Sequence, residues 1–197
     1  MPTGRLETFA DGVFAIAATL LILNVELTHG GGSLAHRLVH LWPSYAAYAV
    51  SFLVIGVIWV SHHTVLNLVD HTDRAFLFVN VLFLLAVAFL PFPTRVLADN
   101  LRGGDARAAA FFYGLTSVAM SIGFQGVWFY ASHGRRLLAP DAGPRLVSGI
   151  TRSFVPGVPL YTLATLLCLV SAWLGAGLYA ALAVFYAASS TVFGREG

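Results

Sequence analysis

Long apolar runs separated by short charged segments constrain the fold of this chain more than any other feature. The last run, residues 155–192, contains no charged side chain, so it is too long for one membrane span and fits two. A bilayer core about 30 Å thick requires about 20 apolar residues per helix. The runs therefore predict six transmembrane helices, at about 6–27, 42–60, 75–94, 108–130, 155–173 and 176–192. We expect an all-α integral membrane protein in which residues 1–197 form one six-helix domain.

Composition excludes several other classes of protein. Only 10% of the residues are charged, whereas a soluble domain has about 25%, and so few charges cannot cover a water-facing surface. The net charge of +2 is too small to suggest a nucleic-acid partner. Cys168 is the single cysteine and lies in an apolar run, and no nucleophile or carboxylate pair is placed at membrane depth. We therefore expect neither an enzyme nor a metal or cofactor site.

All eleven basic residues are arginines, and their distribution predicts the orientation of the chain. Basic residues are enriched in short cytoplasmic loops. Six spans place both termini on one side, and a cytoplasmic N-terminus puts seven arginines inside and four outside. The inner set is Arg5, Arg74, Arg135, Arg136, Arg145, Arg152 and Arg195, and the outer set is Arg37, Arg95, Arg102 and Arg107. We expect a cell-membrane protein with cytoplasmic termini, in which Arg135, Arg136, Arg145 and Arg152 can contact anionic lipid head groups.

Glycine and proline predict where the spans end. The motif Pro91-Phe-Pro93 should close the third helix by Thr94, because proline lacks the N–H that a helix interior needs. Pro156 and Pro159 should kink or delay the start of the fifth helix. Residues 173–177 are the expected turn between the last two helices, and residues 30–33 an external link.

The first helix carries two distinct stripes. At helical spacing Gly12, Ile16, Leu20, Leu23 and Leu27 share one face. A second face, small near its middle, allows a neighbouring helix to approach closely; it contains Asp11, Ala15, Ala18 and Ile22. An ionisable residue inside a span is costly in lipid, so Asp11 should face protein or water. By itself, composition favours interpreting the aliphatic stripe as an ordinary lipid-facing or packing surface.

The same helix resembles a known signature. Arg5-x-x-x-Phe9-Ala10-Asp11, followed by Gly-Val-Phe-Ala-Ile-Ala-Ala-Thr-Leu-Leu, is similar to the first-helix motif Arg-x-x-x-Phe-Ser-Asp of the lysosomal potassium channels, the transmembrane protein one-seven-five family. This chain differs in having Ala10 where serine is usual. Two later segments agree: Trp59-Val-Ser-His62-His63 and Leu90-Pro-Phe-Pro-Thr94. The resemblance covers the first half of the chain, whereas the second half matches only in length and apolarity.

The resemblance implies a potassium-selective cation channel that assembles as a homotetramer with its first helix lining the pore. The constriction residue implied is Ile16, with Leu20 and Leu23 as further rings, and these residues belong to the stripe identified above from periodicity. Four aliphatic side chains offer an ion no oxygen ligands, so ions must shed part of their hydration. Potassium sheds water at lower cost than sodium, and the discrimination should be modest. Thr19 adds a hydroxyl ring, or its hydroxyl bonds its own helix backbone.

Other functions remain as alternatives. A proton-conducting pathway or a secondary transporter would also fit a polytopic membrane protein, although the repeats and broken helices typical of transporters are absent. We expect no resident cofactor, only permeant potassium or other monovalent cations. The partners expected are other copies of the chain and membrane lipids.

Polar residues at the two ends of the first helix are the remaining candidates. We interpret Arg5, Phe9, Asp11, Trp59, His62 and His63 as a structural cluster that sets the packing of the pore helix. The two histidines are alternatively a pH sensor. A metal pair is disfavoured because adjacent helix residues point about 100° apart. Asn24 and Glu26 mark the outer mouth, where Glu26 is either one of four carboxylates that concentrate cations or a solvated helix end.

Overall fold

A computed structural model describes the backbone of residues 3–27 and 33–193, and the side chains of these residues as far as 188. The predicted external link therefore lies almost entirely outside the described residues. Within them the structure is all-α, as expected. Its elements are α1 (Gly4–Leu20), η1 (Leu21–Asn24), α2 (Leu34–His40), α3 (Trp42–Asn67), α4 (Arg74–Phe89), α5 (Pro91–Asn100), α6 (Ala106–Ser132), η2 (His133–Arg135), α7 (Pro144–Phe154), α8 (Gly157–Val170) and α9 (Ala172–Phe193).

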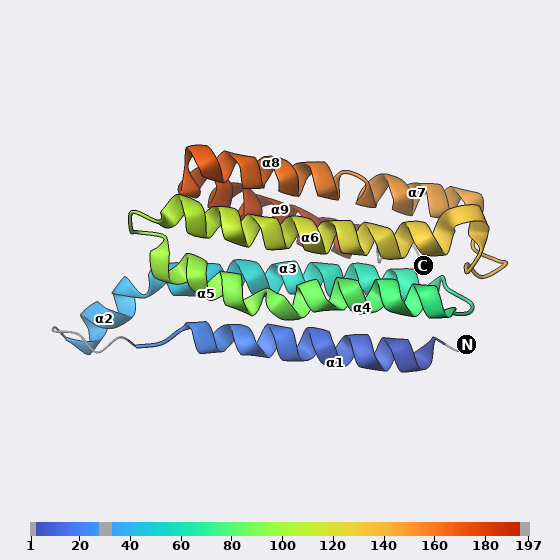
Figure 1. Ribbon diagram of the computed structural model, residues 1–197, viewed down its shortest axis with the longest axis horizontal. Helices are drawn as coiled ribbons and strands as arrows, with labels where there is room; N and C mark the ends of the chain where they lie inside the picture. Colours follow the sequence, from blue (N-terminus) through green and yellow to red (C-terminus); the bar gives the residue numbers. More distant parts are fainter. Residues whose placement is uncertain (1–2, 28–32, 194–197) are drawn as a thin grey trace.

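The long helices run side by side along one axis (Figure 1). The start of α1, the α3–α4 connection, the α6–α7 connection and the end of α9 lie at one end of the bundle, and α2 lies at the other. Five helical stretches in the described residues are long and apolar enough to cross a membrane: Gly4–Asn24, Trp42–Asn67, Arg74–Asn100, Ala106–Arg135 and Pro144–Val170. A sixth apolar stretch, Ala172–Ala188, is shorter.

The third apolar stretch does not end at Thr94 as predicted. The helix is interrupted at Leu90, and Pro91 then begins α5, which continues to Asn100. Proline is well tolerated in the first turn of a helix, where its missing N–H has no partner in any case. Pro91 thus starts a new helix in nearly the same direction instead of closing the old one (Figure 1).

The fifth stretch begins eleven residues before the predicted start at Val155, because α7 (Pro144–Phe154) precedes α8. The interruption between the two helices lies beside Pro156 (Figure 1). Pro159 has no N–H to donate to the carbonyl of Val155. Gln125 of α6 supplies the missing donor, since its Nε2 lies 2.9 Å from the carbonyl oxygen of Phe154 and 3.2 Å from that of Val155. A polar side chain of α6 therefore donates hydrogen bonds to the carbonyl groups that the break in the helix leaves without a backbone partner.

The turn between the last two helices is at Ser171, not at residues 173–177. Ser171 alone is extended, with φ −152° and ψ 126°, and α9 begins at the next residue. Gly175 lies directly against α8, because a Cβ there would overlap the Cys168 sulfur and lie 3.1 Å from the carbonyl oxygen of Ala164. The glycines that suggested a turn instead permit α8 and α9 to approach closely.

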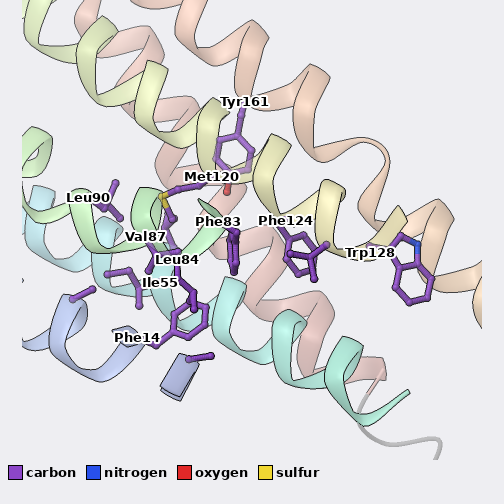
Figure 2. Close-up of a cluster of buried hydrophobic side chains, with 14 of the residues drawn as sticks. Phe14, Ile55, Phe83, Leu84, Val87, Leu90, Met120, Phe124, Trp128 and Tyr161 are labelled. Carbon is purple, nitrogen blue, oxygen red and sulfur yellow. The ribbon is translucent and has the colours of Figure 1, made fainter. Parts of the chain in front are cut away.

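The core is rich in aromatic side chains (Figure 2). Phe83 of α4 is fully buried at its centre, with its ring centroid 6.0 Å from that of Phe14 and 5.9 Å from that of Phe124. Gly123 of α6 faces this ring, since a Cβ there would lie 3.2 Å from the Cα of Phe83. The close approach of α4 and α6 thus holds the wall against which α1 packs.

Polar contacts join the two connections at the α1 end of the bundle. The backbone N–H of Asp70 donates to the carbonyl oxygen of Leu137 at 2.9 Å. Asp73 caps α4 by accepting from the backbone N–H of Phe76 at 2.7 Å, and Arg136 lies 3.0 Å from the same carboxylate. The bond from Phe76 is the largest cause that lowers the pKa of Asp73, with Tyr130 and Arg136 adding to it. This carboxylate therefore stays ionised where the connections meet.

Candidate pore-lining site

The two opposite faces of α1 differ sharply in burial. One face packs against α3 and α4 and consists of Leu6, Ala10, Phe14, Ala17 and Leu21, which are all buried. The other face carries the predicted stripe. Ile16 is 61% exposed, Leu20 42% and Leu23 60%, and Gly12 is exposed as well. An aliphatic stripe thus runs along α1 with no cover from the described part of the same chain.

The outer end of this stripe is not a regular α-helix. α1 ends at Leu20 and continues as the 3₁₀ turn η1, which ends at Asn24. In a 3₁₀ turn, residues three apart lie one above the other, so Leu20 and Leu23 are aligned along the helix axis. Leu27, which was included in the predicted stripe, lies beyond the last helical residue.

The hydroxyl of Thr19 has a partner within its own helix. Its Oγ1 donates to the carbonyl oxygen of Ile16 at 3.0 Å, and the residue is exposed. Of the two roles expected for this side chain, the bond to the backbone is therefore present. Because the hydroxyl oxygen keeps its own lone pairs, the side chain still presents an acceptor to the exposed side of α1.

The predicted packing face of α1 is not the one that packs inside the chain. Asp11, Ala15 and Ile22 are exposed, and Ala18 is only partly buried. Neighbouring helices instead approach along the Ala10 and Ala17 side. Helix 1 is apolar nearly all the way round, so periodicity alone could not distinguish these faces. Asp11 nevertheless faces protein, because the indole Nε1 of Trp59 on α3 donates to its carboxylate at 2.8 Å.

The polar cluster expected around α1 is only partly assembled. Besides the Asp11–Trp59 bond, His63 Nδ1 lies 3.4 Å from a carboxylate oxygen of Glu7, and the ring centroids of Trp59 and His63 are 6.3 Å apart. Arg5 and Phe9 are exposed, and their side chains make no hydrogen bond or ring contact with the described residues. These two residues therefore do not join the cluster within the chain.

His62 points the other way, into the core. Its Nε2 lies 2.8 Å from the side-chain oxygen of Asn80, whose amide nitrogen donates to the carbonyl oxygen of Phe76 at 2.8 Å. Asn80 therefore accepts from the histidine, which assigns the ring proton to Nε2. Phe14 and Phe83 enclose the ring at centroid distances of 5.6 Å and 5.5 Å. The two adjacent histidines thus belong to separate environments and do not form a pair.

The outer end of α1 is tethered to α5. The amide of Asn24 donates to the carbonyl oxygen of Pro91 at 3.0 Å. Glu26 lies 3.2 Å from a guanidinium nitrogen of Arg95, whose Nε is 3.7 Å from Asp99. All three charged side chains are half exposed or more. Within one chain, Glu26 is therefore a solvent-exposed carboxylate paired with Arg95.

Glu7 and Arg95 were not singled out from the sequence as partners. Glu7 lies in the first turn of α1 and Arg95 in the middle of α5, and nothing in their local pattern indicates a partner on another helix. Asn80 had a signal, because an amide in the middle of an apolar run needs a hydrogen-bond partner. Among the described residues, no group of three or more His, Cys, Asp or Glu side chains is placed to hold a metal ion.

Comparison with known proteins identifies the family. The family model for the endosomal/lysosomal potassium channel TMEM175 matches residues 5–91. A potassium channel of Chamaesiphon minutus is 42% identical over 192 residues, which cover 95% of each chain. The crystal structure of a lysosomal potassium-selective channel TMEM175 homologue from the same organism superposes with a TM-score of 0.88 at 40% identity, covering 95% of this chain and 97% of that one.

The animal relatives are more distant. The human endosomal/lysosomal proton channel TMEM175 is 37% identical over 97 residues, which are 44% of this chain and 19% of the human one. Similarity at 42% identity over nearly the whole length leaves no other assignment: the chain belongs to the TMEM175 family of membrane ion channels.

Proposed function

We propose that this protein is a potassium-conducting channel of the cell membrane whose pore is lined by α1 from four copies of the chain. The observation that carries the proposal is the uncovered stripe of Ile16, Leu20 and Leu23, opposite the buried face of the same helix. The Chamaesiphon relatives are named potassium channels, which supports potassium as the permeant ion. One helix of this kind cannot enclose a lumen, so copies must meet around an axis.

The aliphatic stripe explains how such a pore would select. A ring of four Ile16 side chains supplies no oxygen ligands in place of water. An ion crossing the ring therefore loses part of its hydration, at a cost that is larger for sodium than for potassium. Leu20 and Leu23, aligned by the 3₁₀ turn, form further rings on the outer side, and the Thr19 hydroxyl lies beside them. The same rings close the pore when they dewet.

Contacts at both ends of α1 would keep the stripe directed at the axis. At the inner end, the Asp11 carboxylate is held by Trp59 of α3. At the outer end, Asn24 is held by the carbonyl of Pro91 at the start of α5. In this proposal the chain has six spans, with α9 as the sixth, and both termini lie in the cytoplasm.

Reversal potentials of the purified protein in liposomes test the proposal. With potassium inside and sodium outside, we expect a reversal potential that corresponds to a permeability ratio of about ten, which is about 1.4 kcal/mol of discrimination. Equal permeability to both ions would contradict selection by dehydration at an aliphatic ring. Absence of any potassium current would overturn the channel assignment for this chain.

A proton-conducting pathway is the second candidate, because the human relative is named a proton channel. Under equal potassium on both sides, a proton gradient alone then shifts the reversal potential and acidifies a pH indicator enclosed in the liposomes. A potassium channel without proton permeability leaves the indicator unchanged under the same gradient. The two candidates are thus separated in one preparation.

A further inference from the structure

A cavity of about 510 Å³ lies within the half of the bundle that contains the start of α1, away from the α1 stripe. Its wall is formed by α3, α6, α9 and the α7–α8 interruption, and it is mainly apolar and aromatic. Tyr161 and Gly157 at its wall are buried, whereas Arg152 and Phe185 are exposed. Pockets of about 300–1,000 Å³ with such walls bind apolar ligands in other proteins.

The interruption at Pro156 creates this space. The helix is interrupted between α7 and α8, which follow one another nearly in line (Figure 1). Phe154 and Gly157, on either side of the interruption, line the cavity. Gln125 satisfies the carbonyl groups that the break exposes, so the opening needs no further polar cover. Ser61 of α3 lines the opposite side, and its hydroxyl is bonded to the carbonyl of Val57. The wall is thus ready for an apolar occupant.

One cation lies on the edge of the cavity. Arg152 lines it and forms no ion pair with the described residues. Arg145 precedes it by seven residues on α7, so the two guanidinium groups emerge on the same side of the helix. Two arginines of the neighbouring connection are used internally: Arg136 pairs with Asp73, and Arg135 donates to the carbonyl oxygen of Ala142. The positive charge beside the cavity therefore comes from α7.

The depth of Arg152 matches that of a lipid phosphate. About 20 helical residues span the hydrocarbon core of a bilayer. Counted back from Val170 at the far end of α8, that distance ends close to Arg152. With Val170 at the opposite boundary, this count places the guanidinium where hydrocarbon meets head groups, and Gly157, Leu160 and Tyr161 of the cavity wall follow it toward the bilayer centre.

We propose that this cavity binds one anionic phospholipid, from the leaflet at the end of the bundle where α1 begins. Its acyl chain would lie between α3 and α8, and its phosphate on Arg152. Apolar walls below a cation at the head-group boundary are complementary to both parts of such a molecule. The site is separate from the proposed pore, so it can be tested by binding alone.

Native mass spectrometry of the detergent-purified protein measures the head-group part. Phosphatidylglycerol and phosphatidylcholine with identical acyl chains are titrated separately. We expect Arg152→Gln to weaken phosphatidylglycerol binding about fivefold, since one basic side chain near a membrane surface contributes about that factor. Phosphatidylcholine binding should not change. The control Arg107→Gln alters an exposed arginine at the opposite end of the bundle and should change neither. Equal phosphatidylglycerol binding by wild type and Arg152→Gln would overturn the proposal.

Photolabelling with phosphatidylglycerol that carries a diazirine on its acyl chain measures the cavity part. We expect labelled peptides that contain Ser61 of α3 and Leu160 of α8. Ser61→Phe, which fills the cavity, should remove these labels. Labels confined to other helices would refute the site. Loss of binding in Ser61→Phe together with unchanged binding in Arg152→Gln would also refute it, because the occupant would then be an uncharged apolar molecule.

Discussion

Some side chains of α1 have a contact partner within the same chain, and others have none among the described residues. The carboxylate of Asp11 has the Trp59 indole, and the Thr19 hydroxyl has the carbonyl of Ile16. Ile16 itself is 61% exposed, in the middle of a helix whose opposite face is fully buried. A large aliphatic residue left free between well-partnered neighbours is where a change of side chain should affect function more than folding.

Ile16→Asn tests this residue directly. In a fourfold pore the change places four amides at the constriction, which supply oxygen ligands and stabilise water there. We expect larger currents and at least a severalfold lower preference for potassium over sodium, measured as reversal potentials in liposomes. Leu85→Asn on α4 is the matched control, because Leu85 is 66% exposed yet lies on another helix. A selectivity change in Leu85→Asn equal to that in Ile16→Asn would argue against the role of Ile16.

The Asp11–Trp59 bond should affect assembly more than permeation. Asp11→Ala leaves the indole donor of Trp59 unpaired, which costs about 1–3 kcal/mol of stability. Trp59→Phe removes the same bond from the other side, so the losses of thermal stability should be non-additive in the double variant. The potassium preference should stay at its wild-type value. A stable, well-assembled Asp11→Ala protein with altered ion preference would make Asp11 a permeation residue.

At the scale of the element, α1 is a helix with one face packed against α3 and α4 and another face exposed. We call these the committed face and the free face. Ala10 and Ala17 lie on the committed face, where small side chains let α3 and α4 approach. Ala15 is exposed and lies about 100° from Ile16. In a fourfold arrangement this position is next to the lumen, where the α1 helices of neighbouring copies meet.

Two alanine-to-leucine changes should therefore have different consequences. Ala17→Leu overpacks the contact of α1 with α3 and α4, and should lower the free energy of unfolding by about 1–3 kcal/mol. Ala15→Leu should leave the fold of each copy intact and reduce the fraction of assembled complex. Thermal unfolding reports the first effect, and size-exclusion chromatography with light scattering reports the second. A destabilised fold in Ala15→Leu with a tolerated Ala17→Leu would reverse the two faces.

The whole molecule presents a bundle with an unpaired helix face at one side. One chain with a single stripe of this kind cannot surround a pore, so the proposed conduction path exists only in an assembly. In the proposed function, oligomerisation is therefore a requirement for conduction. The lipid site proposed beside α7 lies on the far side of the bundle from α1, so lipid and pore do not compete for the same surface (Figure 1).

Light scattering of the detergent-solubilised protein, corrected for bound detergent, should therefore give the mass of four chains. The complex should persist on dilution, because in a closed ring of four copies each copy contacts two neighbours. A stable monomer or dimer as the main species would contradict the arrangement with α1 at the axis. Ala15→Leu serves as the internal check, since its expected effect is a shift to smaller mass.

Much of the fold was predictable, and the errors share one cause. Hydropathy located the apolar stretches because the bilayer acts on each helix separately. Pro91 and Gly175 were misleading as signals of helix ends, because Pro91 begins a helix and Gly175 serves helix packing. Pro156, in contrast, marks an interruption of the helix, as predicted. α2 and α7 were missed because short or amphipathic helices lack a long apolar run. Each error concerns a residue whose role depends on what lies opposite it.

In the candidate site, too, some features were predictable from the sequence and others depended on the tertiary structure. The sequence by itself determined that Ile16, Leu20 and Leu23 share a side of one helix, because helical period is a local property. Only the tertiary structure decided that this side is the free one, since α1 is apolar nearly all the way round. Likewise, His62 turns to Asn80, 18 positions away, and Glu26 meets Arg95 across 69 positions. Such pairings form when distant helices pack, and no local pattern encodes them.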